Sequence, residues 1–124
     1  MDYPTRPLQA WNEAAGLRKK IYQDITQAKE KGKILVAGGT AIPYELMGGF
    51  GDFELIAGET WGGNLAADND ISTRCLEELE AHGYGKEGCG YYRLFLGSMF
   101  LNYGPVSGFP RPDIVVQINA CDSQ

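Results

Sequence analysis

Three short apolar runs restrict the fold of this 124-residue chain more than any other feature of its sequence. They are KILVA at 33–37, FELIA at 53–57 and IVVQI at 114–118. Short apolar runs between glycine or polar residues are typical of buried strands. The last run is the most apolar, which predicts a strand covered on both faces, as in a parallel sheet.

Helical patterns occupy the stretches before and between these runs. Apolar side chains recur at helical spacing from residue 7 onwards, and Gly32 ends that pattern. Asp68, Asn69 and Asp70 offer an N-cap to a later helix. The sequence predicts helices at about 7–31, 43–50, 71–82 and 88–103.

The alternation of strands with helices predicts an α/β fold, a Rossmann-like three-layer domain with a mainly parallel sheet. Residues 1–32 are expected to form an N-terminal helical segment, and residues 33–124 the α/β domain. The glycine-rich stretch GETWGG at 58–63 is predicted to be a loop. Because no helix follows the last run to cover it, we expect the chain to be the N-terminal part of a larger subunit.

The charge of the chain excludes some classes of partner. Eleven basic residues against sixteen acidic ones give a net charge of −5, which argues against nucleic acid or an anionic membrane as the main partner. The sequence contains no run of membrane-spanning length and no secretory signal pattern, so we expect a cytoplasmic protein. Three cysteines in such a compartment are not expected to form a disulfide framework.

Two of the cysteines lie at the ends of predicted elements. Cys89 stands at a helix start, where the helix dipole favours a thiolate, and Cys121 follows the carboxyl end of the last strand. Ligands collect at such positions in open parallel sheets, so we expect both sulfurs in one crevice. Thiolates suit zinc or iron–sulfur clusters, although two are too few for a four-thiolate site. Both cysteines could equally be structural, and Cys89 could be a catalytic nucleophile.

The other candidate ligands lie on the third predicted helix. Cys75 shares an apolar stripe with Ile71 and Leu79, so it is expected in the core. His82 is the only histidine, and it falls on the same stripe or at the helix end. A metal ligand remains one interpretation of His82, but a buried or capping role is favoured.

Four segments, taken in order, resemble the benzoyl-CoA reductase / 2-hydroxyacyl-CoA dehydratase family. CGYYRLFLG begins at Cys89, and PRPDIVVQINACD begins at Pro110. Upstream, KGKILVAGGTAIPYEL resembles the family's strand and its P-x-E-L helix start, and GETWGGNLAA resembles its E-N-Y-like loop. The resemblance covers about residues 31–122.

The resemblance implies a subunit that carries a [4Fe–4S] cluster on three cysteines, with one open iron position. Cys89 and Cys121 match two of these ligands, and the third is expected outside this chain. Some family members have a further cysteine in the first strand-to-helix loop, where this chain has Gly39 or Thr40.

The resemblance also implies an activity and its partners. Family members receive an electron from an ATP-dependent activator protein and pass it to an acyl-CoA thioester, with a homologous second subunit in the complex. The outcome is dehydration of a 2-hydroxyacyl-CoA or reduction of an aromatic acyl-CoA. A non-catalytic or split member serving as a structural or electron-transfer module is the alternative, and a small ligand-binding domain with incidental cysteines is a third.

Three residues of the chain receive roles by this analogy. Glu59 is the candidate proton donor or substrate contact, and Thr40 the candidate hydrogen-bond donor to the thioester oxygen. Arg93 is a candidate for orienting the cluster-bearing helix or binding a CoA phosphate. Their ordinary alternatives are a solvated surface carboxylate, a helix cap and an ion pair.

Overall fold

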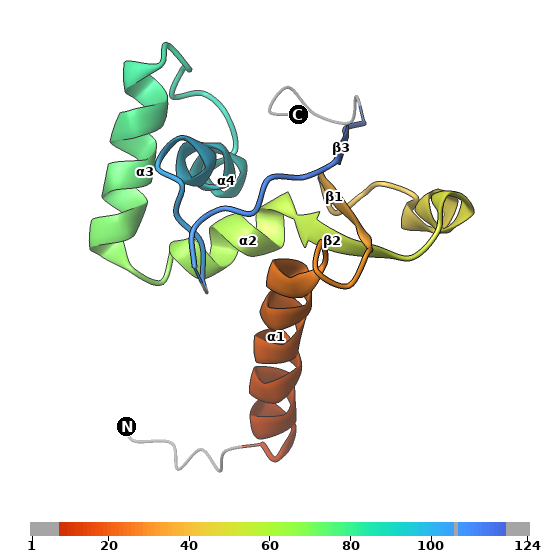
Figure 1. The fold of residues 1–124 in the computed structure, drawn as a ribbon. Helices are drawn as coiled ribbons and strands as arrows, with labels where there is room; N and C mark the ends of the chain where they lie inside the picture. Colours follow the sequence, from red (N-terminus) through yellow and green to blue (C-terminus); the bar gives the residue numbers. More distant parts are fainter. Residues whose placement is uncertain (1–7, 106, 119–124) are drawn as a thin grey trace.

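The computed structural model describes residues 8–105 and 107–118, so Cys121 lies outside the described residues. The elements, shown in Figure 1, are α1 (Ala10–Gln27), β1 (Ile34–Gly38), the 3₁₀ helix η1 (Tyr44–Phe50), β2 (Phe53–Ala57), α2 (Gly58–Leu65), α3 (Asn69–Ala81), α4 (Gly90–Phe100) and β3 (Ile114–Val116).

The three strands form one parallel sheet in the order β2-β1-β3. Val36 of β1 stands opposite Leu55 of β2 and Ile114 of β3. The central strand is the most buried, since Leu35, Val36 and Ala37 are each 1% exposed. The predicted α/β fold with a mainly parallel sheet is therefore confirmed, and the open sheet fits part of a Rossmann-like domain.

Strand β3 is shorter and more open than predicted. Residues 117 and 118 are not in the strand, and the side chain of Val115 is 61% exposed. The expectation of a strand covered on both faces is wrong for the described part of the chain. The physical reason is that β3 lies at the sheet edge, where it pairs with β1 on one side and the face bearing Val115 is open.

Asp113 holds the start of β3 against β1. Its carboxylate accepts a hydrogen bond from the Leu35 backbone N–H at 2.9 Å and lies 3.3 Å from the Lys29 ammonium. Its own N–H donates to the Leu35 carbonyl oxygen at 2.8 Å. The backbone hydrogen bond, and then Lys29, hold the pKa of the Asp113 carboxyl below its usual value.

Glycines allow the helices α2, α3 and α4 to pack with their backbones close together. A Cβ atom on Gly62 of α2 would lie 1.9 Å from the Tyr91 carbonyl oxygen of α4. A Cβ atom on Gly97 of α4 would lie 2.0 Å from the Cys75 carbonyl oxygen of α3. Figure 1 shows α4 beside α2 and α3. The close packing of these helices therefore requires glycine at the two contact positions.

The stretch GETWGG forms the first turns of α2, so the predicted loop at 58–63 is wrong. Gly and Thr have low intrinsic helix propensity, but tertiary packing overrides it here. Trp61 and Leu65, four residues apart, are 2% and 4% exposed and face the core together. Gly58 and Gly62 of α2 have no Cβ atom, so α4 can pack close to the α2 backbone at these two positions.

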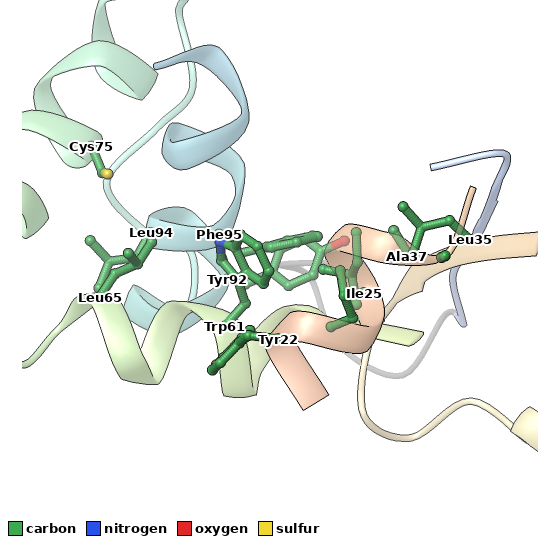
Figure 2. Close-up of a cluster of buried hydrophobic side chains, with 12 residues drawn as sticks. Tyr22, Ile25, Leu35, Ala37, Trp61, Leu65, Cys75, Tyr92, Leu94 and Phe95 are labelled. Atoms are coloured by element: carbon green, nitrogen blue, oxygen red, sulfur yellow. The ribbon is translucent and has the colours of Figure 1, made fainter. Parts of the chain in front are cut away.

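An aromatic cluster joins α1 to the helical layer (Figure 2). The Trp61 ring lies 5.6 Å from the Tyr22 ring of α1 and 5.2 Å from the Phe109 ring, both edge-on. Ile25 is also buried, whereas Trp11 and other apolar residues in the first half of α1 are exposed. Helix α1 is thus anchored by its C-terminal half, and its N-terminal half projects away from the sheet, as Figure 1 shows.

Helix α3 confirms most of its predicted features. Asp68 is its N-cap and accepts hydrogen bonds from the backbone N–H groups of Asp70 and Ile71 at 3.0 and 3.2 Å. Cys75 is fully buried, as expected of a core residue, and burial raises the pKa of its thiol. His82 is the C-cap residue with its side chain 45% exposed, so its terminal position is confirmed and a buried one is wrong.

None of the helices within residues 8–105 and 107–118 qualifies as a membrane-spanning segment.

Candidate functional site at the carboxyl edge of the sheet

The carboxyl ends of the three strands meet at one edge of the sheet. Gly38 at the end of β1 stands opposite Ala57 of β2 and Val116 of β3. Open parallel sheets bind ligands in the crevice beyond this edge. A Cβ atom on Gly38 would lie 2.3 Å from the Val116 carbonyl oxygen, so glycine is needed for β1 to end in this register.

Two residues predicted from the sequence, Thr40 and Glu59, meet at this edge. The backbone N–H of Thr40 donates a hydrogen bond of 2.8 Å to Oε2 of Glu59. Glu59 lies in the first turn of α2, directly after β2, and Thr40 lies in the turn after β1. The contact ties the two strand-to-helix connections together. Thr40 does not cap η1, because Pro43 occupies the N-cap position.

Tyr44 is a third polar residue at this edge, and sequence reasoning missed it. Its hydroxyl donates a hydrogen bond to the Gly39 carbonyl oxygen. Burial, and then the charge of Glu59, raise the pKa of the Tyr44 hydroxyl. A phenol directly after a helix-initiating proline and six residues after the strand end was the available signal. The phenol therefore stays protonated and able to donate through the neutral pH range.

Cys89 is the N-cap residue of α4 and is exposed. Its carbonyl oxygen accepts the Arg93 backbone N–H at 2.9 Å, and its side chain makes no capping hydrogen bond to the first turn. The first half of α4 packs on the start of α2, since a Cβ on Gly58 would lie 2.9 Å from the Phe95 ring. The middle of the helix that carries Cys89 therefore lies beside the first residue of α2, which follows the carboxyl end of β2. The predicted meeting of Cys89 with Cys121 is not tested, because Cys121 lies outside the described residues.

Arg93 points away from this edge, toward α3. Its guanidinium lies 2.5 Å from the Glu80 carboxylate and 3.4 Å from the Lys86 carbonyl oxygen. The side chain is 14% exposed. The ordinary interpretation of Arg93 as an ion-pair residue is confirmed. Desolvation opposes ionisation of Glu80, but its bonds to Lys86 and Arg93 lower its pKa overall.

The described residues contain no group of three or more His, Cys, Asp and Glu side chains placed to hold a metal ion. Cys89 nevertheless fits one ligand position of an anionic cluster. The residue is exposed, and it is the N-cap of a helix of 11 residues, whose dipole favours negative charge at this end. A single thiolate cannot hold a cluster, so further ligands from outside these residues are required.

Comparison of the sequence with models of known protein families found no match, and comparison with curated proteins found no relative. The fold and the edge geometry therefore carry the functional argument.

Proposed function

We propose that this chain is the N-terminal segment of an iron–sulfur subunit of a cytoplasmic acyl-CoA dehydratase or reductase. Cys89, Cys121 and a cysteine outside this chain would hold its [4Fe–4S] cluster. The observation that carries the proposal is the position of Cys89, exposed at the start of a helix that packs on α2, which itself begins directly after the carboxyl end of β2. Thiolate ligands at that position are stabilised by the helix dipole.

The chain's own residues would bind and orient the acyl thioester at the edge. The cluster, when bound, would supply single electrons to the substrate. Glu59 fixes the turn that carries Thr40 through the 2.8 Å bond to its backbone N–H, which leaves the Thr40 hydroxyl as a separate donor for the thioester oxygen. The neutral phenol of Tyr44 donates its proton to the Gly39 carbonyl oxygen and so supports the backbone beside them.

Anaerobic production of the chain, alone and together with the product of the adjacent reading frame, tests this proposal. Iron and acid-labile sulfide would be measured after reconstitution, and the cluster would be recorded by electron paramagnetic resonance. We expect Cys89→Ser and Cys121→Ser to lose most of the bound iron. Cys75→Ala is the matched control, because Cys75 is buried in the core away from any ligand position.

Two outcomes would contradict the proposal. One is a folded chain that binds no iron under either condition. The other is bound iron that the Cys89 and Cys121 substitutions leave unchanged. Circular dichroism of each variant separates a lost ligand from a lost fold.

A non-catalytic module is the second candidate, and the Glu59 contact favours it. The Glu59 carboxylate accepts the Thr40 backbone N–H at 2.8 Å, and this hydrogen bond stabilises the loop whether or not a substrate is bound. Under this alternative the chain co-purifies with its partner subunit without iron, and Cys89→Ser leaves the activity of the complex unchanged.

A further inference from the structure

We propose that a pocket between α1, α2 and the start of α3 binds a small organic carboxylate with an apolar body. The pocket has a volume of about 340 Å³, near the lower end of the range for small-molecule sites. It shares no residue with the carboxyl-edge site. The inference does not depend on the proposed function.

Two cations of α1 define one wall of the pocket. Arg18 and Lys19 both line it, and neither makes an ion pair within residues 8–105 and 107–118. The next residue, Lys20, faces elsewhere and pairs with Asp24 one turn along the helix. Arg18 lies one turn before Tyr22, whose pKa its charge lowers against the larger opposite effect of burial. Arg18 and Tyr22, one turn apart on α1, line the same pocket.

The carboxylate of Asp68 also lines the pocket, and it already accepts two backbone hydrogen bonds. Asp68 accepts the backbone N–H groups of Asp70 and Ile71 as the N-cap of α3. Its charge is balanced by the helix terminus. The lining holds two cations against this one anion, so an added anion would find an unopposed positive charge.

The remaining walls set the shape and the apolar character of the ligand. Leu65, Ile71 and Pro105 give apolar surface, and Tyr103 gives an aromatic face. Asn64 is held in place, since its amide nitrogen donates to the Tyr22 hydroxyl and to the Thr60 carbonyl oxygen. Two cations and an apolar floor together suit a carboxylate on a short aromatic or branched body.

Titration of the full-length chain with 3-phenylpropanoate, followed by two-dimensional NMR of backbone and Asn side-chain amides, tests this inference. We expect saturable shifts at Asn64 and Tyr103, with a dissociation constant of about 1 mM, a strength usual for ligands of this size. The neutral analogue 3-phenylpropanol is expected to bind at least about tenfold more weakly, because it lacks the charge. Inorganic phosphate, which lacks the apolar body, is expected to be similarly weak.

Three consecutive basic residues supply the variants. Arg18→Gln and Lys19→Gln are each expected to weaken binding of the carboxylate by about tenfold. Lys20→Gln is the matched control and should bind as the parent does, because Lys20 is outside the pocket. All three positions are exposed on α1, so folding should be retained in each variant.

The inference is overturned if the alcohol or phosphate binds as tightly as the carboxylate. It is equally overturned if Lys20→Gln weakens binding as much as Arg18→Gln, since that would indicate general attraction to α1. Absence of shifts at Asn64 and Tyr103 at 20-fold excess over ~1 mM would contradict it directly.

Discussion

The indole N–H of Trp61 donates a hydrogen bond of 3.1 Å to the hydroxyl oxygen of Ser98, and both residues are buried. The Ser98 hydroxyl in turn donates to the Phe95 carbonyl oxygen at 2.6 Å. A hydroxyl has one proton and can also accept, so a serine satisfies both groups at once. The relationship joins α2 to α4 in the middle of the aromatic cluster.

Ser98→Ala should lower the free energy of unfolding by about 1–3 kcal/mol, because the buried indole N–H is left without its acceptor. Urea denaturation monitored by Trp fluorescence measures the change. Ser72→Ala is the matched control, since the Ser72 hydroxyl bonds only the Asn69 carbonyl oxygen in the exposed first turn of α3. We expect it to cost less than about 0.5 kcal/mol. An equal loss of unfolding free energy in the two variants would show that the buried hydrogen bond stabilises the protein no more than the exposed one does.

Adjacent glycines in α2 should respond to alanine in opposite directions. Gly62→Ala places a methyl group 1.9 Å from the Tyr91 carbonyl oxygen, and a backbone atom can yield only if α4 moves. We expect destabilisation of at least about 1–3 kcal/mol. Gly63→Ala meets no atom within 4 Å and should stabilise the protein by about 0.5–1 kcal/mol through helix propensity. Thermal unfolding of both variants tests this expectation. A change of the melting temperature in the same direction for both variants would contradict the close packing of α2 on α4.

Local sequence patterns predicted strands β1 and β2 and the α3 helix well. The FELIA run is β2 with the predicted bounds, and KILVA differs from β1 by one residue at each end. Asp68 caps α3 as expected, because a short side-chain acceptor before a helical pattern has few other roles. Cys75 is in the core because it lies on the same helical stripe as Leu79. These features depend on neighbours close in the sequence.

The features that the sequence did not reveal depend on contacts distant in the chain. Helix α2 contains three glycines that favour a loop, and only its packing on α4 explains them. The openness of β3 follows from its place at the sheet edge, which an apolar run does not encode. In the candidate site, Thr40 and Glu59 were chosen by analogy, but their direct contact, and Tyr44 beside them, required the strand register.

The bond between Thr40 and Glu59 predicts a specific pattern of hydrogen exchange. In Glu59→Ala the Thr40 backbone N–H loses its acceptor, so its exchange should accelerate by about tenfold or more, as for loss of a bond of about 1.4 kcal/mol. Glu59→Gln keeps a side-chain oxygen that can accept and should preserve most of the protection. Exchange measured by NMR tests both variants. Equal protection of the Thr40 N–H from exchange in the parent and in Glu59→Ala would show that Glu59 does not hold the turn after β1 against the start of α2.

The Asp113 carboxylate predicts how stability falls in acid. Its pKa is lowered from a usual value of 3.8, first by the Leu35 backbone hydrogen bond and then by Lys29. A carboxyl with a lowered folded-state pKa stabilises the fold fully above its unfolded pKa and loses that contribution as the pH falls through the folded value. We therefore expect Asp113→Asn to be less stable than the parent at pH 7, with the difference shrinking below about pH 3.8. Urea unfolding between pH 7 and pH 2.5 measures this, with Asp52→Asn, an exposed aspartate before β2, as control. A difference between Asp113→Asn and the parent that is constant across this pH range would contradict the charge-dependent clamp on β3.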